Sequence, residues 1–152
     1  YGVATVGVMR VMPASRNTIP GSVYFSVDMR HPNDDALTQM HAALQASLAT
    51  ICGELGLQYE VTEISYTKPV VFDPECVATV RMAANECGFD GLDFVSGAGH
   101  DACYVNRVAP TGMIFVPCAD GISHNEIESA TPEDLAAGCN VLLRAMLGRA
   151  VL

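Results

Sequence analysis

The chain has 152 residues, half of them hydrophobic, which allows one domain of ordinary size or two small ones and excludes global disorder. It carries 8 basic and 17 acidic residues, for a formal net charge of −9. This balance argues against nucleic acid and anionic membranes as partners, because both require a basic face. No stretch approaches the roughly 20 apolar residues that span a bilayer.

The first half of the chain predicts a sheet covered by one helix. Alternating or β-branched residues indicate strands, and a stripe of apolar residues behind an N-cap at Asn33 or Asp34 indicates a helix. The predicted elements are strands at 3–11, 21–30 and 57–66 and a helix at about 34–55. A strand-strand-helix-strand order favours an antiparallel sheet with a helix on one face.

The second half of the chain predicts a different order of secondary-structure elements. Two prolines bracket an apolar run at 68–74, which we interpret as a domain boundary. Helices and strands then alternate, which favours an α/β layer with a largely parallel sheet. The predicted elements are a helix at 74–87, a strand at 92–95, a turn and helix at 96–106, a strand at 111–116, a loop at 117–129 and a final helix that Thr131 caps.

The six cysteines are widely and irregularly spaced, without a C-x-x-C pair. This pattern argues against a zinc finger and against a disulfide framework. We predict mostly reduced and buried cysteines in a cytoplasmic protein. They are Cys52, Cys76, Cys87, Cys103, Cys118 and Cys139.

Two of the four histidines are candidate site residues, because they follow short predicted strands, where α/β proteins place their sites. His100 ends the small-residue turn S-G-A-G-H, whose Gly99 allows a ligand close to the backbone or serves only a tight turn. His124, in the loop G-I-S-H-N-E, is either a metal ligand, a general base or a solvated side chain. His31 and His41 are interpreted as solvated or rim residues.

Asn17 and Arg30 form another candidate pair. Asn17 lies in the turn between the first two predicted strands, and Arg30 ends the second. If the chain doubles back so that the two side chains meet, an amide and a guanidinium would suit a ligand with a carboxylate. A turn asparagine and a strand-end ion pair are the simpler interpretation.

Three motifs in this order resemble the amidase, hydantoinase/carbamoylase family: N-T-I-P-G-S-V-Y-F-S-V-D-M-R-H, S-G-A-G-H-D-A and M-I-F-V-P-C-A-D-G-I-S-H-N-E. That family contains N-carbamoyl-L-amino-acid hydrolases, allantoate amidohydrolases and β-ureidopropionase-like enzymes. It belongs to the dinuclear-metal aminopeptidase-like hydrolases. The resemblance covers essentially the whole chain and is specific for the family, but not for one substrate.

The resemblance implies an α/β fold made of two parts. Residues 1–67 would be the later part of an α+β lid and dimerisation domain, and residues 68–152 the C-terminal part of an α/β catalytic domain. The implied activity is metal-dependent hydrolysis of a carbamoyl (ureido) C–N bond in N-carbamoyl-L-amino acids or allantoate, which are small substrates bearing a carboxylate. The implied enzyme is a cytoplasmic homodimer, paired through the lid domain.

The resemblance also implies roles for individual residues. His124 falls on the family's last metal ligand, Asn17 and Arg30 on substrate-binding positions, and Gly99 and His100 on the loop that lines the substrate pocket. Arg30 would hold the substrate carboxylate. The complete enzyme would hold two divalent ions, zinc or manganese, which activate a bridging water.

The other ligands and the general-base glutamate of the family have no counterpart in this sequence. One ligand does not hold a catalytic metal, since such sites need three or more. We therefore expect the C-terminal portion of an enzyme, which is inactive by itself, with no catalytic residue assigned in this chain. The alternatives are a non-catalytic dimerisation or binding module and a relative that cleaves peptides.

Overall fold

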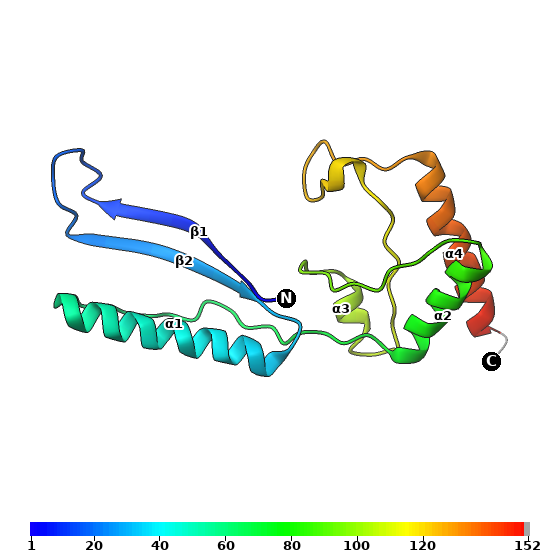
Figure 1. The fold of residues 1–152 in the computed structure, drawn as a ribbon, viewed down its shortest axis with the longest axis horizontal. Helices are drawn as coiled ribbons and strands as arrows, with labels where there is room; N and C mark the ends of the chain where they lie inside the picture. The colour runs from blue at the N-terminus through cyan, green and yellow to red at the C-terminus, as the bar shows by residue number, and fades with distance from the viewer. Residues whose placement is uncertain (151–152) are drawn as a thin grey trace. The chain divides into compact units, whose positions relative to one another are not determined.

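The computed structural model describes residues 1–150, and the chain divides into two compact units, Tyr1–Pro69 and Val70–Leu152 (Figure 1). We call them unit 1 and unit 2. In the described part of the chain, no helix is long and apolar enough to cross a membrane. Whether the units correspond to a lid and a catalytic domain stays a prediction.

Unit 1 begins with a hairpin of two antiparallel strands, β1 (Val3–Met12) and β2 (Ser22–Arg30). The strands pair from Val3 opposite Arg30 to Met12 opposite Ser22, with a register irregularity between Val6 and Val8. Both strands were predicted from their β-branched and alternating residues, and both are confirmed. Arg30 therefore lies at the open end of the hairpin, beside the start of β1.

Helix α1 (Asp34–Leu55) lies along the hairpin (Figure 1). The side chain of Asn33 accepts the backbone N–H of Ala36 at 2.8 Å, which confirms the predicted N-cap. The helix ends at Gly56, whose φ of 64° lies in the left-handed region that favours glycine. These local signals explain why the predicted bounds agree with the observed ones.

The strand predicted at 57–66 is wrong. This segment is not paired with any strand in the described chain, whose one sheet consists of β1 and β2. It is tied back to the start of α1, where the Tyr66 hydroxyl donates to the Asp34 carboxylate and Lys68 lies 3.4 Å from the same carboxylate. Alternating residues satisfy the side-chain pattern of a strand, but a ladder also needs a partner for the backbone groups.

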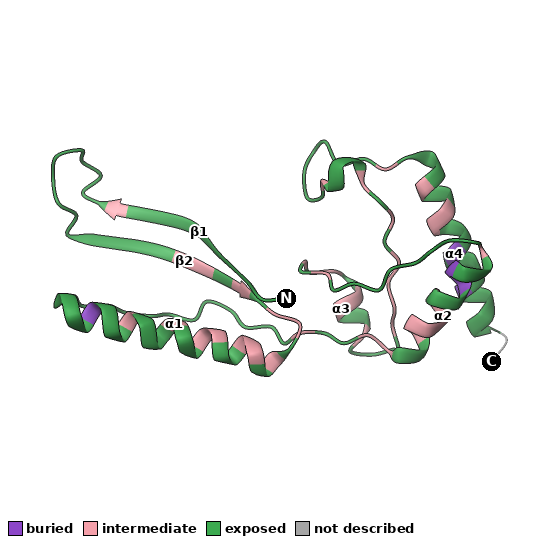
Figure 2. Ribbon diagram, in the orientation of Figure 1, coloured by how far each residue is buried: buried purple, intermediate pink, exposed green. Residues whose placement is uncertain are grey.

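Unit 2 is organised around two helices, α2 (Pro74–Glu86) and α4 (Pro132–Ala150). Both were predicted, with Asp73 capping α2 and Thr131 capping α4 through bonds to backbone N–H groups. Their interface is the small core of the unit, purple in Figure 2. It consists of Ala83, Ala84, Val141 and Ala145. Small side chains let two helices approach closely, so a few residues suffice to form it.

The remaining elements of unit 2 are short. Helix α3 (Ala102–Val105) and the 3₁₀ helix η1 (Ala119–Gly121) interrupt long extended segments. The predicted strands at 92–95 and 111–116, and the parallel sheet they would form, are wrong for residues 1–150, whose one sheet is the β1–β2 hairpin. Segment 111–116 instead packs against helices without a ladder, because no neighbouring strand is hydrogen bonded to it.

All six cysteines are free thiols, but the prediction that most of them are buried is wrong. Cys52 is buried, Cys139 is exposed, and the other four are half-buried. The physical reason is the small size of the core, since five described residues fall in the buried class.

Candidate functional site

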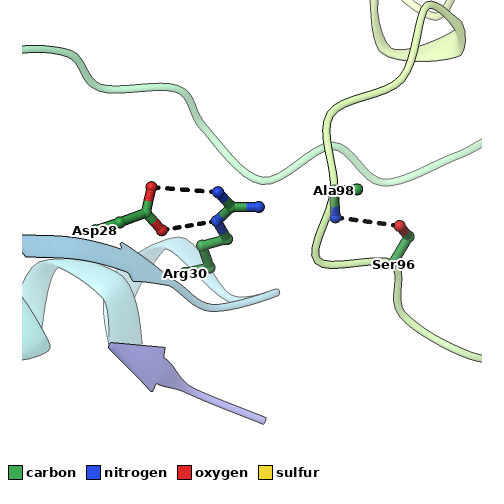
Figure 3. A network of polar contacts seen from close by, with 4 residues as sticks. All are labelled: Asp28, Arg30, Ser96 and Ala98. Carbon is green, nitrogen blue, oxygen red and sulfur yellow. Dashed lines mark hydrogen bonds and ion pairs between the residues drawn. The ribbon is translucent and has the colours of Figure 1, made fainter. Parts of the chain in front are cut away.

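The turn that follows residue 95 is held by hydrogen bonds of one serine. The Ser96 Oγ lies 2.7 Å from the Nε2 of His100 and accepts the backbone N–H of Ala98 at 3.2 Å (Figure 3 shows the second bond). The His100 ring meets Phe115 edge-on, with centroids 5.3 Å apart and planes at 71°. The predicted candidate His100 is thus a half-buried side chain whose ring is oriented by Ser96 and Phe115.

The glycines of this turn are not needed for its conformation. Neither Gly97 nor Gly99 has a positive φ, and an ideal Cβ at either position would have no atom within 4 Å. The interpretation as a tight turn that requires positive φ is therefore wrong. Open space beside Gly99 instead leaves room for a ligand to approach the backbone. Helix α3 has four residues, which is too short to offer a helix-terminus anion site.

The second predicted site loop, 117–129, is held by the carboxylate of one glutamate. Glu128 accepts the backbone N–H of His124 at 2.9 Å, and its other oxygen lies 3.9 Å from the Cys118 sulfur. His124 itself is exposed and has a φ of 56°. A non-glycine residue in that region costs free energy and often marks a functional position. The Glu128 bond helps to hold the backbone in this conformation.

The described residues do not form a metal site. No group of three or more histidine, cysteine, aspartate or glutamate side chains in residues 1–150 is arranged to hold an ion. His124 would offer one imidazole nitrogen, whereas catalytic zinc sites use three protein ligands. The residues present therefore do not fit a two-metal centre by themselves, and the assignment of His124 as a ligand stays a prediction.

In unit 1, Arg30 forms an ion pair with a residue of its own strand. Its Nε donates to the Asp28 Oδ1 at 2.7 Å, and its Nη2 to the Oδ2 at 3.3 Å (Figure 3). These hydrogen bonds hold the pKa of the Asp28 carboxyl below its usual range. The strand-end ion pair that was the simpler interpretation of the sequence is present. Its two parallel bonds fix the plane of the guanidinium.

Asn17 lies in the loop that joins β1 to β2. Its Oδ1 accepts the Ser15 hydroxyl at 2.8 Å, and Thr18 donates to Ser15 at 3.2 Å. The idea that Asn17 and Arg30 meet because the chain doubles back is wrong for a single copy. The loop lies at the closed end of the hairpin and Arg30 at the open end, so the nine residues of β2, roughly 27 Å from first to last, separate them.

The other two histidines, His31 and His41, lie just before α1 and on α1 itself. The His31 Nδ1 accepts the backbone N–H of Asn33 at 2.9 Å and so supports the turn that begins α1. His41 is half-buried on α1. Neither is a candidate site residue.

Three side chains that hold candidate residues or their loops in place were not identified from the sequence: Asp28 on β2, and Ser96 and Glu128 in loops. Asp28 had a usable signal, because residues i and i+2 of a strand share a face, and a carboxylate two positions before an arginine favours an ion pair. The contacts of Ser96 and Glu128 depend on the path of irregular loops, for which the sequence offers no comparable pattern.

Comparison with known proteins defines the class to which this arrangement belongs. Residues 3–148 match the model of Peptidase family M20/M25/M40, and the chain belongs to this family. It has the family's fold, with mixed helix and strand content. The resemblance to hydantoinase/carbamoylase amidases is confirmed by the relatives that follow.

Among curated proteins, the chain is 46% identical over 145 residues to an N-carbamoyl-L-amino-acid amidohydrolase of Rhizobium meliloti, covering 95% of the chain and 35% of that relative. It is 36% identical over 138 residues to an allantoate amidohydrolase of Bacillus subtilis, covering 91% and 34%. The chain thus spans about a third of the length of these relatives.

Among solved structures, the chain is similar to an amidase of the hydantoinase/carbamoylase family from Burkholderia multivorans. The two share 60% identity and a TM-score of 0.95, over 99% of this chain and 36% of that one. The path of the chain, including its unpaired extended segments, is thus close to that of a corresponding part of a larger amidase.

Proposed function

We propose that the chain is the C-terminal part of an amidohydrolase that cleaves the carbamoyl C–N bond of N-carbamoyl-L-amino acids or of allantoate. The observation that carries the proposal is the similarity to amidohydrolases of both kinds over more than nine-tenths of the chain. In this proposal, unit 1 belongs to a lid and dimerisation domain, and unit 2 to a catalytic domain.

Arg30 is assigned to the substrate carboxylate. A guanidinium binds a carboxylate through two parallel N–H bonds, which fixes the orientation of the ligand as well as its position. The bonds to Asp28 orient the side chain before a ligand arrives, so less side-chain freedom is lost on binding. N-carbamoyl-L-amino acids and allantoate both carry a carboxylate, so the assignment suits either substrate.

Gly99, His100 and His124 are assigned to the pocket and to the metal centre. Gly99 and His100 lie on the loop that Ser96 holds, with open space beside the glycine. Hydrolases of this family generally use divalent metals. We assign His124 as one ligand, with the remaining ligands supplied by parts of the natural protein outside this sequence, and with zinc or manganese as the ion.

Asn17 requires a second copy of the chain if it binds the same substrate as Arg30. The two residues lie at opposite ends of one hairpin, roughly 27 Å apart, whereas a small substrate is much shorter. We therefore propose a homodimer in which Asn17 of one copy and Arg30 of the other reach the same substrate. A two-fold axis makes this exchange reciprocal, so that the dimer has two equivalent sites.

The test of the function is a substrate panel on the full natural protein that contains this chain. N-carbamoyl-L-amino acids, allantoate and dipeptides are offered before and after chelation and re-addition of zinc or manganese. The proposal predicts release of ammonia from carbamoyl substrates or allantoate, with loss on chelation and recovery with metal. Cleavage of dipeptides alone would contradict it and favour the peptidase-like relative.

A further inference from the structure

We propose that Ser96 is a positioning residue that holds neutral His100 with its proton on Nδ1, so that the ring offers this N–H as a donor to a ligand oxygen. The tautomer follows from contacts in unit 2 alone. The assignment of the ligand oxygen to a substrate carbonyl or carboxylate rests on the proposed function.

The hydrogen-bonding capacity of Ser96 selects the tautomer. A serine hydroxyl has one proton to donate and two lone pairs to accept with. One lone pair of Ser96 Oγ accepts the Ala98 N–H at 3.2 Å. If Nε2 of His100 carried the proton, it would donate to Ser96, and both the hydroxyl proton and the Nδ1 lone pair would lack a partner among the described residues.

The opposite arrangement leaves one group, the Nδ1–H, without a partner among the described residues instead of two. With Nε2 as an acceptor, Ser96 donates its proton across the 2.7 Å contact and still accepts the Ala98 N–H. The proton of the neutral ring then lies on Nδ1. The tautomer of a histidine is commonly set in this way, by the bond that its other nitrogen makes.

The ring is also fixed in orientation. Phe115 meets it edge-on, and Phe115 is itself packed against Phe94, with centroids 4.8 Å apart. Rotation of the ring about its axis by a half-turn would break the Ser96 bond. No hydrogen-bond partner of Nδ1 is found among the described residues, so its N–H is available to a ligand oxygen.

A neutral N–H donor suits an oxygen ligand such as a carbonyl or a carboxylate. Such a donor binds the oxygen without supplying a full positive charge, unlike the guanidinium of Arg30. His100 would therefore contribute a single neutral hydrogen bond to binding.

The tautomer is tested by nitrogen-15 NMR on the full natural protein labelled at histidine, with His100→Gln identifying the His100 signals. At a pH where the ring is neutral, we expect Nδ1 in the protonated region and Nε2 in the acceptor region. Ser96→Ala is expected to shift His100 toward the Nε2–H form, and Ser96→Thr, which keeps the hydroxyl, to retain the wild-type pattern. Ser47→Ala, an exposed serine on α1, is the matched control.

An Nε2–H tautomer in the wild type, or an unchanged pattern in Ser96→Ala, would overturn the proposal. These readings do not depend on any activity, so they stand even if the substrate panel fails. A merely structural role of Ser96 would loosen the turn without favouring one protonated nitrogen.

The donor role is tested by kinetics with the substrate that the panel identifies. Ser96→Ala is expected to raise KM about ten-fold, the usual effect of losing one hydrogen bond, with a smaller change in kcat. Ser96→Thr should restore KM. If NMR confirms the tautomer but KM does not change, His100 does not donate to the substrate. The proposed hydrolase function would not be affected by that result.

Discussion

The two units of the chain hold their secondary structure by different means. Unit 1 depends on backbone bonds between sequence neighbours: the β1–β2 ladder runs the length of both strands with one irregularity between Val6 and Val8, yet Cys52 is the one residue of this unit in the buried class. Unit 2 has no ladder among its described residues, but its two long helices share a core of four buried side chains. Unit 1 is thus held mainly by local hydrogen bonds and unit 2 mainly by packing. Substitutions that change the packing should therefore alter the stability of unit 2 more than that of unit 1.

The largest expected effect on stability is a substitution that overfills unit 2. A Cβ at Gly138, on α4, would lie 2.5 Å from the Val116 Cγ1, a contact that forces one of them to move. We expect Gly138→Ala to destabilise unit 2 by about 1–3 kcal/mol. Hydrogen exchange of α4 amides in the natural protein measures this, and protection equal to the wild type would contradict it.

The matched control lies in unit 1. Gly53, on α1, has no atom within 4 Å of its Cβ position. Alanine is the better helix former, so Gly53→Ala should stabilise α1 by about 0.5–1 kcal/mol. Opposite signs for the same substitution would confirm that packing limits unit 2 and not unit 1.

Truncation of a core side chain should give a smaller effect in the same direction. Val141 is 6% exposed in the α2–α4 core, and Val141→Ala should cost about 1–2 kcal/mol. Val6, on β1, is 55% exposed, and Val6→Ala should change stability by less than about 0.5 kcal/mol. Equal losses at both positions, measured by hydrogen exchange of the two units, would contradict the contrast between them.

The smallest expected effect concerns the helix caps and pH. Asp73 caps α2, and its hydrogen bond from the Cys76 N–H lowers the pKa of the carboxyl. Because the pKa of Asp73 is lower in the folded than in the unfolded state, the ionised carboxyl stabilises the fold fully above the unfolded pKa, near 4. This stabilisation is lost as the pH falls through the folded pKa. Acid should therefore weaken the cap of α2.

Asn33 is the corresponding cap of α1 and does not titrate, so its own hydrogen bond should not change with pH. Asp34 beside it does titrate, with a pKa that the hydrogen bond from Tyr66 lowers, so the decisive comparison is between wild type and Asp73→Asn at α2. The measurement is hydrogen exchange at the first turns of both helices between about pH 5 and pH 3, in wild type and Asp73→Asn. The asparagine variant keeps an acceptor and should remove the extra acid sensitivity of α2. Equal sensitivity in both proteins would show that Asp73 is not its source.

The elements that were predicted correctly are those with local signals. Asn33, Asp73 and Thr131 cap the helices that follow them, and alternation identified β2. Extended segments such as 57–66 and 111–116 carry the side-chain pattern of strands, but a ladder depends on a distant partner that no local pattern describes. The helices were therefore more predictable than the sheet.

In the candidate site, too, residues with a local sequence signal could be predicted and residues that depend on distant contacts could not. His100 and His124 were recognisable from their place in loops and from motifs, and Asp28 could have been found from strand periodicity. The side chains that hold these loops, Ser96 and Glu128, were not predictable, because their partners are set by the three-dimensional path of the turn. Asn17 and Arg30 were separated by the hairpin, since strand pairing places a loop and an open end far apart.

The assembly is tested by mixing variants of the natural protein. If Asn17 and Arg30 reach one substrate from different copies, a mixed dimer of Asn17→Ala and Arg30→Ala has one intact site and one doubly altered site. Random exchange of two inactive variants should then restore about a quarter of the wild-type activity. Mass spectrometry verifies that the mixed dimer has formed. If activity does not recover in that dimer, Asn17 and Arg30 of different copies do not share a substrate.

The central claim, that Arg30 binds the carboxylate of a carbamoyl substrate, is tested most directly by steady-state kinetics of Arg30→Ala in the natural protein. Arg10→Ala, an arginine on β1 that faces Tyr24, is the control. We predict that KM for an N-carbamoyl-L-amino acid rises about ten- to a hundred-fold in Arg30→Ala and is unchanged in Arg10→Ala. An unchanged KM in Arg30→Ala would remove this residue from the site and contradict the account.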